Sequence, residues 1–241
     1  MRKVAALVML GAVVILLILP LGCIGNLDIT GSGNLETKSE NFSGFAKIEA
    51  QTGFQVVVSQ SSTYSIEITA DDNVHKYIDV SKSGDTLRIK VDSGHTWHSV
   101  TLKANITMPD LYELDFSSGA QATITGFNFT HDFTINLSSG SHVTGDIDVG
   151  DADFNLSSGS HITLAGSADD LEADGSSGSH FNMEDFALNN ADITLSSGSH
   201  AAINMSGTLD VNLSSGSHVT YTGNPTMGDI NVSGDSTLKA D

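Results

Sequence analysis

Five histidines occupy the same position of a short repeated motif, and imidazole can bind metal ions, move protons or stack on its neighbours. Each histidine ends a copy of Ser-Ser-Gly-Ser-His, so hydroxyls and a ring recur together every 18 to 20 residues. If one copy occupies one turn of a stacked fold, the rings form a row with about 5 Å between neighbours. Neutral imidazoles in such a row predict a candidate site for Zn, Cu or Ni. The five candidates are His142, His161, His180, His200 and His218.

The same row also has a structural interpretation, in which the rings stack along one edge or bond to neighbouring hydroxyls. The serines then bond backbone groups at a turn, or each other between turns. Because closely spaced imidazoles resist being charged together, we expect lowered pKa values in the folded state and a loss of stability in acid. The structural interpretation is favoured and predicts no cofactor; a bound divalent metal is the alternative.

Serine, histidine and aspartate are also the parts of hydrolytic sites, but their repetition argues against one active site. A catalytic triad is a single constellation with a positioned base and an oxyanion hole, and no Gly-x-Ser-x-Gly sequence occurs. A pair of carboxylates could still cleave sugars, and Asp146-x-Asp148 with Asp151-x-Asp153 is the best candidate. We therefore predict that the protein is not an enzyme, with a β-helix glycan hydrolase or lyase as the alternative.

The motif belongs to a longer repeat that spans residues 117–236, with a degenerate first copy and a shortened last one. Apolar residues recur five and three positions before the central glycine, and three and five positions after it. This alternation predicts two short strands around a turn, and glycine supplies the backbone freedom that the turn needs. The repeat-turn glycines are Gly119, Gly140, Gly159, Gly178, Gly198, Gly216 and Gly234.

A period near 19 residues with strand-turn-strand content predicts stacked coils, each of which buries its apolar positions only against its neighbours. Leucine-rich repeats are excluded because their Leu-x-x-Leu-x-Leu frame is missing, and propeller blades need about 40 residues or more. The calcium-binding nonapeptide motif is also absent. The predicted fold class is therefore all-β, a parallel β-solenoid (β-helix) with about 18–21 residues per coil.

The N-terminus predicts export. Residues 1–22 combine a basic start with an apolar run, which is the layout of a signal peptide. Cys23 follows Leu-Gly and is the candidate lipid anchor, although Pro20 departs from the usual lipoprotein pattern. An uncleaved anchor and plain secretion are the alternatives. We expect residues 23–44 to form a lipid-anchored tether and residues 45–241 to form the β-domain, anchored to the outside of the cell membrane.

Charge and cysteine content restrict the partners. The chain has a formal net charge of −19, with 29 acidic residues against 10 lysines and arginines. This balance disfavours nucleic acid, whose phosphates need basic partners. The single cysteine excludes an internal disulfide. Extracellular glycans, surface proteins and cations remain as partners, besides the membrane at the N-terminus. Calcium at the coil corners is an alternative to a simply solvated acidic surface.

The sequence of residues 45–108 also predicts strands. Together with the segment before them, these residues resemble a known family. The resemblance rests on Gly31-Ser32-Gly33-Asn34, Phe42 to Ile48, Phe54 to Val58, Ile66 to Asn73 and Gly84 to Ile89, together with the Ser-Gly-Ser repeats. These stretches are similar to the auto-transporter adhesin, head GIN domain family. The resemblance implies exported, often lipid-anchored proteins built as right-handed parallel β-helices, and it supplies no catalytic residues.

The function predicted from the sequence is that of a cell-surface-anchored, non-enzymatic β-solenoid, either an adhesin or another surface binding module. The alternative binding class is a metal- or carbohydrate-binding module that uses the histidine row. Because an uncapped coil leaves unpaired strand edges, self-association through the ends of the solenoid is a further prediction.

Overall fold

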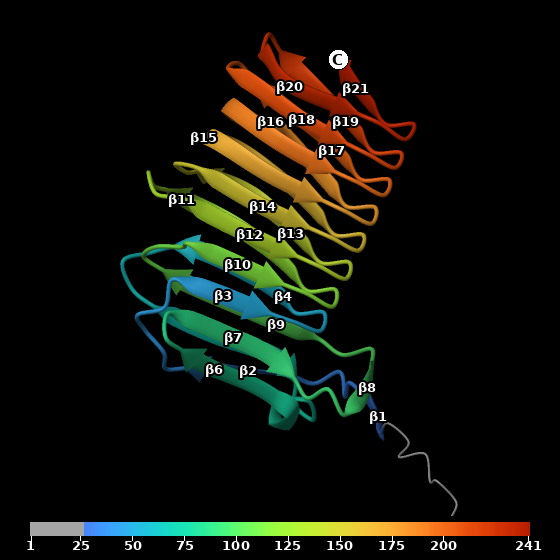
Figure 1. The fold of residues 1–241 in the computed structure, drawn as a ribbon. Helices are drawn as coiled ribbons and strands as arrows, with labels where there is room; N and C mark the ends of the chain where they lie inside the picture. The colour runs from blue at the N-terminus through green and yellow to red at the C-terminus, as the bar shows by residue number, and fades with distance from the viewer. Residues whose placement is uncertain (1–26) are drawn as a thin grey trace, which may run out of the picture.

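The computed structural model describes residues 27–241 and shows a rod of stacked β-coils (Figure 1). Its elements in this range are strands, apart from one short 3₁₀-helix. The prediction of an all-β solenoid is therefore confirmed. The predicted signal peptide and Cys23 lie outside the described residues.

The N-terminal region, residues 27–108, contains β1 (Leu27–Thr30), β2 (Leu35–Glu40), β3 (Lys47–Ala50), β4 (Gln55–Gln60), β5 (Ser65–Asp71), η1 (His75–Tyr77), β6 (Ile78–Ser83), β7 (Thr86–Val91), β8 (His95–His98) and β9 (Leu102–Met108). The repeat region, residues 109–241, contains β10 (Glu113–Phe116), β11 (Gln121–Asn128), β12 (Phe133–Leu137), β13 (His142–Asp148), β14 (Ala152–Leu156), β15 (His161–Gly175), β16 (His180–Leu195), β17 (His200–Met205), β18 (Thr208–Leu213), β19 (His218–Gly223), β20 (Thr226–Val232) and β21 (Thr237–Ala240).

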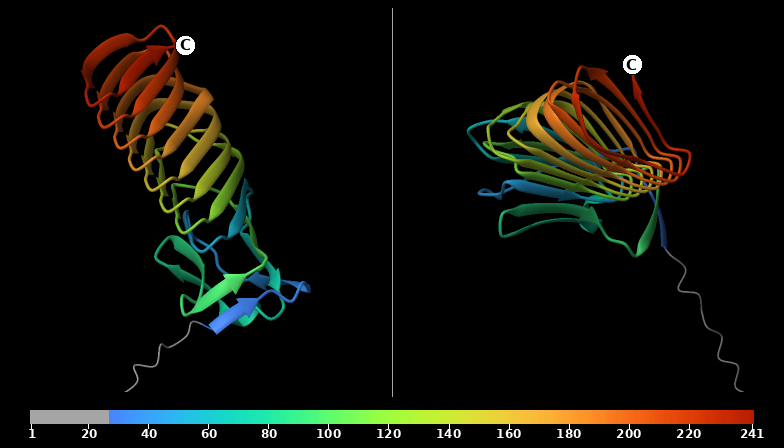
Figure 2. Two further views of the ribbon diagram at one scale, coloured as in Figure 1. Left: turned by 90° about the vertical axis from the view of Figure 1, so that its right-hand side faces the viewer. Right: turned by 45° about the horizontal axis from the view of Figure 1, so that its top comes forward.

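The coils of the repeat region stack with their strands parallel and form two long faces. The histidine face consists of β11, β13, the first part of β15 and of β16, β17, β19 and β21. The acidic face consists of β10, β12, β14, the last part of β15 and of β16, β18 and β20. Figure 2 shows the tight turns aligned along one edge of the stack. Equivalent residues of successive repeats therefore lie side by side.

Alternating side chains divide each strand between core and solvent. Ile135 and Leu137 before the turn and Val143 after it are buried, whereas Asn136 and His142 between them are partly exposed. The same pattern holds in the other copies, so the apolar positions form continuous columns along the rod. This confirms the predicted phase of the repeat, because side chains of a strand alternate between its two sides.

The repeat turn has two consecutive residues in the left-handed region. Ser139 has φ 55° and Gly140 has φ 73°, which is the pattern of a type I′ turn. A left-handed serine is unfavourable by about 1–2 kcal/mol, so the surroundings must stabilise it. The Gly140 N–H donates to the Ser158 carbonyl of the next turn at 3.0 Å, and the same contact recurs along the edge.

One repeat departs from the consensus in two core positions: a glycine replaces a leucine on one strand, and a phenylalanine replaces a smaller residue on the facing strand. Gly175 takes the position that Leu137, Leu156 and Leu195 hold in other copies. A Cβ on Gly175 would lie 2.7 Å from Cε2 of Phe181 and even closer to Leu195. Phe181 replaces the smaller Val143 and Ile162 of the facing strands. The large ring and the missing side chain therefore compensate for each other.

The order of coils along the rod differs from their order in the sequence. β3 pairs with β7 on one side and with β10 on the other, so residues 47–60 lie between later parts of the chain. The turn of this coil repeats the backbone of the motif, with φ 59° at Thr52 and φ 70° at Gly53. A search by period misses this copy because Gly53 is 66 residues away from Gly119. Its apolar phase matches that of the repeats.

The N-terminal end is closed by antiparallel strands. β5 pairs antiparallel with β2 and β9, and β6 pairs antiparallel with β7. β1 pairs with β8 at the side of this end. The expectation of a flexible tether is therefore wrong for residues 27–40, which form two strands. Their motif Gly-Ser-Gly-Asn docks on Asp71 to Asn73, a contact that local sequence patterns do not reveal.

Candidate functional site: the two repeated faces

The five motif histidines form the predicted column on the histidine face. They pair in register from His142 to His218. The ring centroids of His161 and His180 lie 4.5 Å apart with an angle of 1° between planes, and those of His180 and His200 lie 5.0 Å apart at 5°. The end pairs are also in contact, at 5.6 and 4.9 Å. The structure thus confirms the stacked row.

Buried serines form hydrogen bonds to the backbone of the turn that precedes each histidine. The fourth residue of each motif, such as Ser160, is fully buried. Its hydroxyl lies 2.7 Å from the Ser157 carbonyl and 3.1 Å from the Leu137 carbonyl, and it accepts the Ser157 N–H at 3.1 Å. Ser179 also donates to Ser199 of the next coil. These bonds stabilise the left-handed turn, so the serines have the predicted structural role.

Burial and neighbouring rings disfavour the charged form of two histidines. The pKa of His142 is lowered by desolvation and by the charge of His161. The pKa of His180 is lowered by desolvation and by its neighbours on both sides. The Nδ1 atom of His180 is buried without a hydrogen-bond partner in the structure. The positions of His142 and His180 therefore favour the neutral imidazole.

The geometry gives no support to the metal alternative. Within residues 27–241, no three His, Cys, Asp or Glu side chains are grouped so that they could hold a metal ion. The physical reason lies in the stacking, since nearly parallel rings 4.5–5.0 Å apart point their nitrogens side by side. Zinc binds imidazole nitrogens at about 2.0–2.1 Å, which requires rings that converge on one point.

The acidic face carries carboxylates in register. Asp153, Glu172, Asp192 and Asp210 follow one another on neighbouring strands. No lysine or arginine occurs between Lys103 and Lys239, so no such side chain within the repeats can offset these charges. Like charges directly opposite each other in a sheet are destabilising. Repulsion within this column therefore lowers the stability of the rod.

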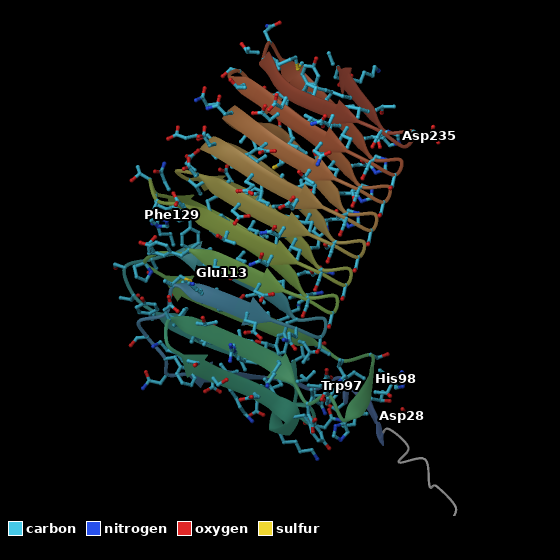
Figure 3. All side chains as sticks on the ribbon, viewed as in Figure 1. Asp28, Trp97, His98, Glu113, Phe129 and Asp235 are labelled. Carbon is cyan, nitrogen blue, oxygen red and sulfur yellow. The ribbon has the colours of Figure 1, made fainter. Side chains whose placement is uncertain are left out.

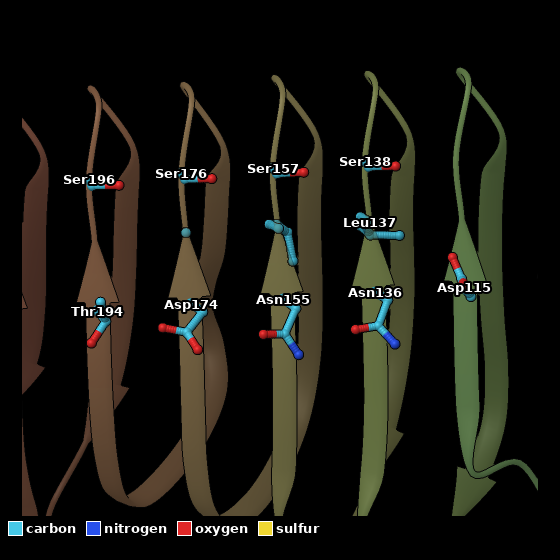
Figure 4. Close-up of a pocket in the computed structure, with 12 residues that line it drawn as sticks. Asp115, Asn136, Leu137, Ser138, Asn155, Ser157, Asp174, Ser176, Thr194 and Ser196 are labelled. Carbon is cyan, nitrogen blue, oxygen red and sulfur yellow. The ribbon is translucent and has the colours of Figure 1, made fainter.

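A groove runs along the acidic face beside the repeat turns (Figure 4). It has a volume of about 440 Å³ and follows the stack across several coils. One polar side chain per coil points into it, and a row of motif serines forms its rim. The polar row consists of Asp115, Asn136, Asn155, Asp174 and Thr194, and the rim consists of Ser138, Ser157, Ser176 and Ser196.

Two carboxylates of this groove are held in an environment that disfavours charge. Desolvation raises the pKa of Asp115, and Glu49 and Glu113 raise it further. Desolvation also raises the pKa of Asp174, together with the charges of Asp153 and Asp192. A ligand that donates hydrogen bonds to these groups would relieve the like-charge repulsion. Hydroxyl groups are such donors.

The carboxylates considered for sugar cleavage do not form one site. Asp146 and Asp148 lie on β13 of the histidine face, whereas Asp153 lies on β14 of the acidic face. Asp148 accepts hydrogen bonds from Ser167 at 2.7 Å and from Asn128 at 3.1 Å. Asp153 accepts one from Asn155 at 2.8 Å. Asp148 and Asp153 therefore have hydrogen-bond partners within the rod, and the candidate carboxylates are divided between two faces.

Sequence reasoning missed a clamp in the N-terminal region. Asp71 is buried and accepts the N–H groups of Gly33 and Thr101, each at 2.7 Å. The Thr101 hydrogen bond is the main reason why the pKa of Asp71 is lowered. Asn73 donates to the Thr30 carbonyl at 2.9 Å. Gly33 and Asp71 lie in two of the stretches that carry the family resemblance, whereas Thr101 lies outside them, and only the fold brings the three together.

A second missed feature is a stack of rings at the start of the repeat region. His131 lies between Tyr112 and Phe129, with centroid distances of 3.8 and 3.9 Å. Its Nε2 atom lies 2.7 Å from Oδ1 of Asp110. Phe129 is labelled in Figure 3, at the edge where β11 ends. Phe129 also packs against the apolar core, so the stack is anchored to the rod through this ring.

Comparison with known proteins identifies the family. A family model described as "Putative auto-transporter adhesin, head GIN domain" matches residues 44–225. The chain belongs to this family. The GIN-domain model covers most of the described rod, including both the N-terminal region and the repeats. No curated protein matches the chain in sequence.

Solved structures share the fold of this GIN-domain chain. A putative adhesin from Bacteroides fragilis is 19% identical, with a TM-score of 0.83, and the match covers 88% of this chain and 100% of that one. A protein from Parabacteroides distasonis described as a putative lipid binding protein is 18% identical, with a TM-score of 0.72 and coverage of 89% and 99%. A putative adhesin from Parabacteroides merdae is 17% identical, with a TM-score of 0.69 and the same coverage.

The family description indicates a surface or exported protein. Within residues 27–241, no helix is long and apolar enough to span a membrane. The two long faces are therefore the candidate functional surfaces, because they present the same groups repeatedly along the rod.

Proposed function

We propose that the protein is an exported, non-enzymatic binding module of the adhesin type, anchored to the outside of the cell through lipidated Cys23. The observation that carries this proposal is the groove of the acidic face, which offers one polar side chain per coil and a rim of hydroxyls. Family membership supports a surface role. The serial arrangement favours binding of an extended partner over the conversion of a small substrate.

The groove chemistry favours a neutral glycan chain as the ligand. Amide, carboxylate and hydroxyl groups form hydrogen bonds with sugar hydroxyls, and the coils repeat at about 4.8 Å. The acidic surroundings repel anionic polymers. Asn155 can serve as a probe of the groove, since it lies in the middle of the polar row.

A glycan array tests the proposal, with residues 27–241 as the probe and with chelator present in half of the wells. We expect binding to neutral glycans that chelator does not change. Asn155→Ala should weaken it about tenfold or more, whereas Asn182→Ala on the histidine face should leave it unchanged. Binding that depends on metal, or equal loss in both variants, would contradict this assignment.

Anchoring is tested separately on cells that express the full chain. We expect labelled fatty acid to be incorporated into the protein and the protein to stay with the membrane fraction. Cys23→Ser should abolish labelling and release the chain. Retention of Cys23→Ser in the membrane without label would instead indicate an uncleaved anchor.

A further inference from the structure

The N-terminal end of the rod lies close to the proposed lipid anchor. Leu27, the first residue of β1, follows Cys23 by four residues, and four fully extended residues span at most about 14 Å. β1 pairs in parallel with β8, which places Ile29 beside Trp97. Figure 3 shows Trp97 and His98 at this end. With lipid on Cys23, β8 is therefore within reach of the membrane surface.

A cluster of aromatic rings occupies this corner of the rod. The ring centroid of Tyr77 lies 4.6 Å from that of His95 and 5.5 Å from that of Trp97. Nζ of Lys76 lies 4.8 Å from the centroid of Tyr77. Tyr77 and Trp97 are partly exposed, and Trp97 also packs against the core, so the rod holds the cluster in place. Tyrosine and tryptophan favour the boundary between lipid and water, because each joins an apolar ring to a polar atom.

The apolar side chain of Leu35 is exposed near this cluster. It is 55% exposed, the largest fraction among the large apolar side chains of residues 27–241. Leu35 begins β2, and the N–H of Gly31, four residues earlier, donates to the His98 carbonyl of β8 at 3.0 Å. One short segment therefore connects the exposed leucine to the aromatic corner.

Two lysines take core-side positions at the same end. Among residues 27–241, β2 and β6 are the outermost strands there (Figure 1). Lys38 of β2 lies opposite the buried Ile68, and Lys82 of β6 lies opposite the buried Leu87. Side chains directly opposite each other project from the same side of a sheet, so both lysines continue core columns. Their aliphatic stems cover apolar surface while the ammonium groups stay free to reach lipid phosphates.

Charge favours an approach of this end to a membrane. Residues 27–108 contain seven lysines and arginines against ten acidic residues, a net charge of −3, whereas residues 109–241 contain one against nineteen, a net charge of −18. At the end itself, Glu36 lies 3.3 Å from Lys38, which offsets its charge. Anionic lipids give membranes a negative surface potential, so the repeat region is repelled from the surface. The nearly neutral N-terminal region is the part that approaches it most easily.

We propose that the N-terminal end of the rod docks on the lipid headgroup layer of the membrane, which holds the rod upright and its repeat region away from the surface. Trp97 and Tyr77 lie at headgroup level. Leu35 enters the apolar boundary, and Lys76 binds lipid phosphates. This inference rests on the proposed anchor at Cys23, because the tether keeps this end at a high effective concentration near the lipid and a small contact is then sufficient.

The single tryptophan of the chain makes this contact directly measurable. Because Trp97 is the only tryptophan, its fluorescence reports this corner alone. The lipidated full chain is reconstituted into vesicles of phosphatidylcholine and phosphatidylglycerol. We expect emission at a shorter wavelength than that of residues 27–241 free in solution, and quenching by lipids brominated near the headgroup. Leu35→Ser combined with Lys76→Glu should reduce this quenching about threefold or more, because an apolar and an electrostatic contact with lipid are both lost.

The matched control makes the same two kinds of change on the side of the rod. Val57→Ser combined with Lys103→Glu alters exposed residues of the neighbouring strands β4 and β9, and it should leave the quenching unchanged. Circular dichroism should show that both variants stay folded. Co-sedimentation with the vesicles reports the lipid anchor separately. Anchored chain whose Trp97 emission equals that of the free protein would overturn the docking but not the anchoring, whereas chain left in the supernatant with unshifted emission would contradict both.

Energy transfer to the membrane surface determines the orientation of the anchored rod. Nine strand spacings of about 4.8 Å, or about 43 Å, separate β6 from β20. A dye on Ser83→Cys, at the end of β6, should transfer efficiently to an acceptor in the headgroup layer. A dye on Asp235→Cys, in the turn after β20, should transfer little. Equal transfer from both positions would overturn the proposal, because it would mean that the rod lies flat.

Discussion

The N-terminal region and the repeat region build the same rod by different means. The N-terminal region uses antiparallel strands, a buried carboxylate and the ion pairs of lysine and arginine, such as Arg88 with Glu49 at 2.6 Å. The repeat region uses one turn and one set of apolar columns again and again. The comparison shows that the N-terminal region depends on contacts that each occur once. The repeat region depends on contacts that recur in every coil, and it therefore presents the same side chains repeatedly along its surface.

The first way to test this contrast is to remove the buried carboxylate of the N-terminal region. Asp71→Ala leaves the N–H groups of Gly33 and Thr101 without their acceptor. We expect a loss of roughly 3–5 kcal/mol in unfolding free energy, because each hydrogen bond to a charged group contributes about 1.5–3 kcal/mol. Urea denaturation measures the change. Asp72→Ala, at an exposed neighbour, is the control and should cost less than about 1 kcal/mol.

The second test concerns Gly175 and Phe181, the two core residues that depart from the consensus of the repeats. Gly175→Leu restores the consensus residue but collides with Phe181 and Leu195, so we expect a loss of about 3 kcal/mol from overpacking. Phe181→Val should recover part of this loss when it is combined with Gly175→Leu, since Val143 and Val219 hold the same position in other coils. Thermal and urea denaturation of the four proteins complete the double-mutant cycle. Purely additive effects would contradict the proposed exchange of volume.

The third test uses pH, to which the histidine column should respond before the carboxylates do. The pKa values of His142 and His180 are lowered in the folded protein, so the unfolded chain takes up protons first as pH falls through 6.5. Their contribution to stability is complete above that pH and is lost below it. We expect a lower melting temperature at pH 5.5 than at pH 7.5.

The control for the pH test replaces both histidines with glutamine, the residue found at Gln55 and Gln121 in the same column. This variant should show a flatter pH dependence over the same range. The pKa values of Asp115 and Asp174 are raised in the folded protein, so these two carboxylates act in the opposite direction. A wild-type melting temperature that does not change between pH 7.5 and 5.5 would count against the column as a titrating unit.

The smallest expected effect lies on the acidic face. Glu172→Gln removes one of four carboxylates in register, so we expect stabilisation by a few tenths of a kcal/mol up to about 1 kcal/mol. Added salt should stabilise the wild type more than this variant, because salt screens the repulsion. Glu67→Gln, at an exposed position of β5 in the N-terminal region, serves as the comparison and should change little. Destabilisation by Glu172→Gln would indicate a bound cation.

The repeat alone was sufficient to predict most of the stack. Alternation around Gly140 and its equivalents predicted the strands, the buried columns and the register of the histidines, because each coil interacts mainly with its neighbours. The coil around Gly53 was missed, since its neighbours in space are distant in sequence. The groove was missed for a related reason: Asp115, Asn136 and Asn155 belong to three repeats, and only stacking sets them in one row.

The sequence by itself determined the solenoid, the inward and outward alternation and the ladder of rings, because all three follow from a local period and short-range sterics. The tertiary structure decided how the rings of the ladder lie: those of His161, His180 and His200 stack nearly parallel, an arrangement that does not favour convergence of their nitrogens on one metal ion. It also decided that residues 27–40 form part of the fold through Asp71. Contacts between segments that are distant in the sequence, such as β2 with β5 and β3 with β10, place the N-terminal region on the first coils of the stack, and a local period does not reveal them.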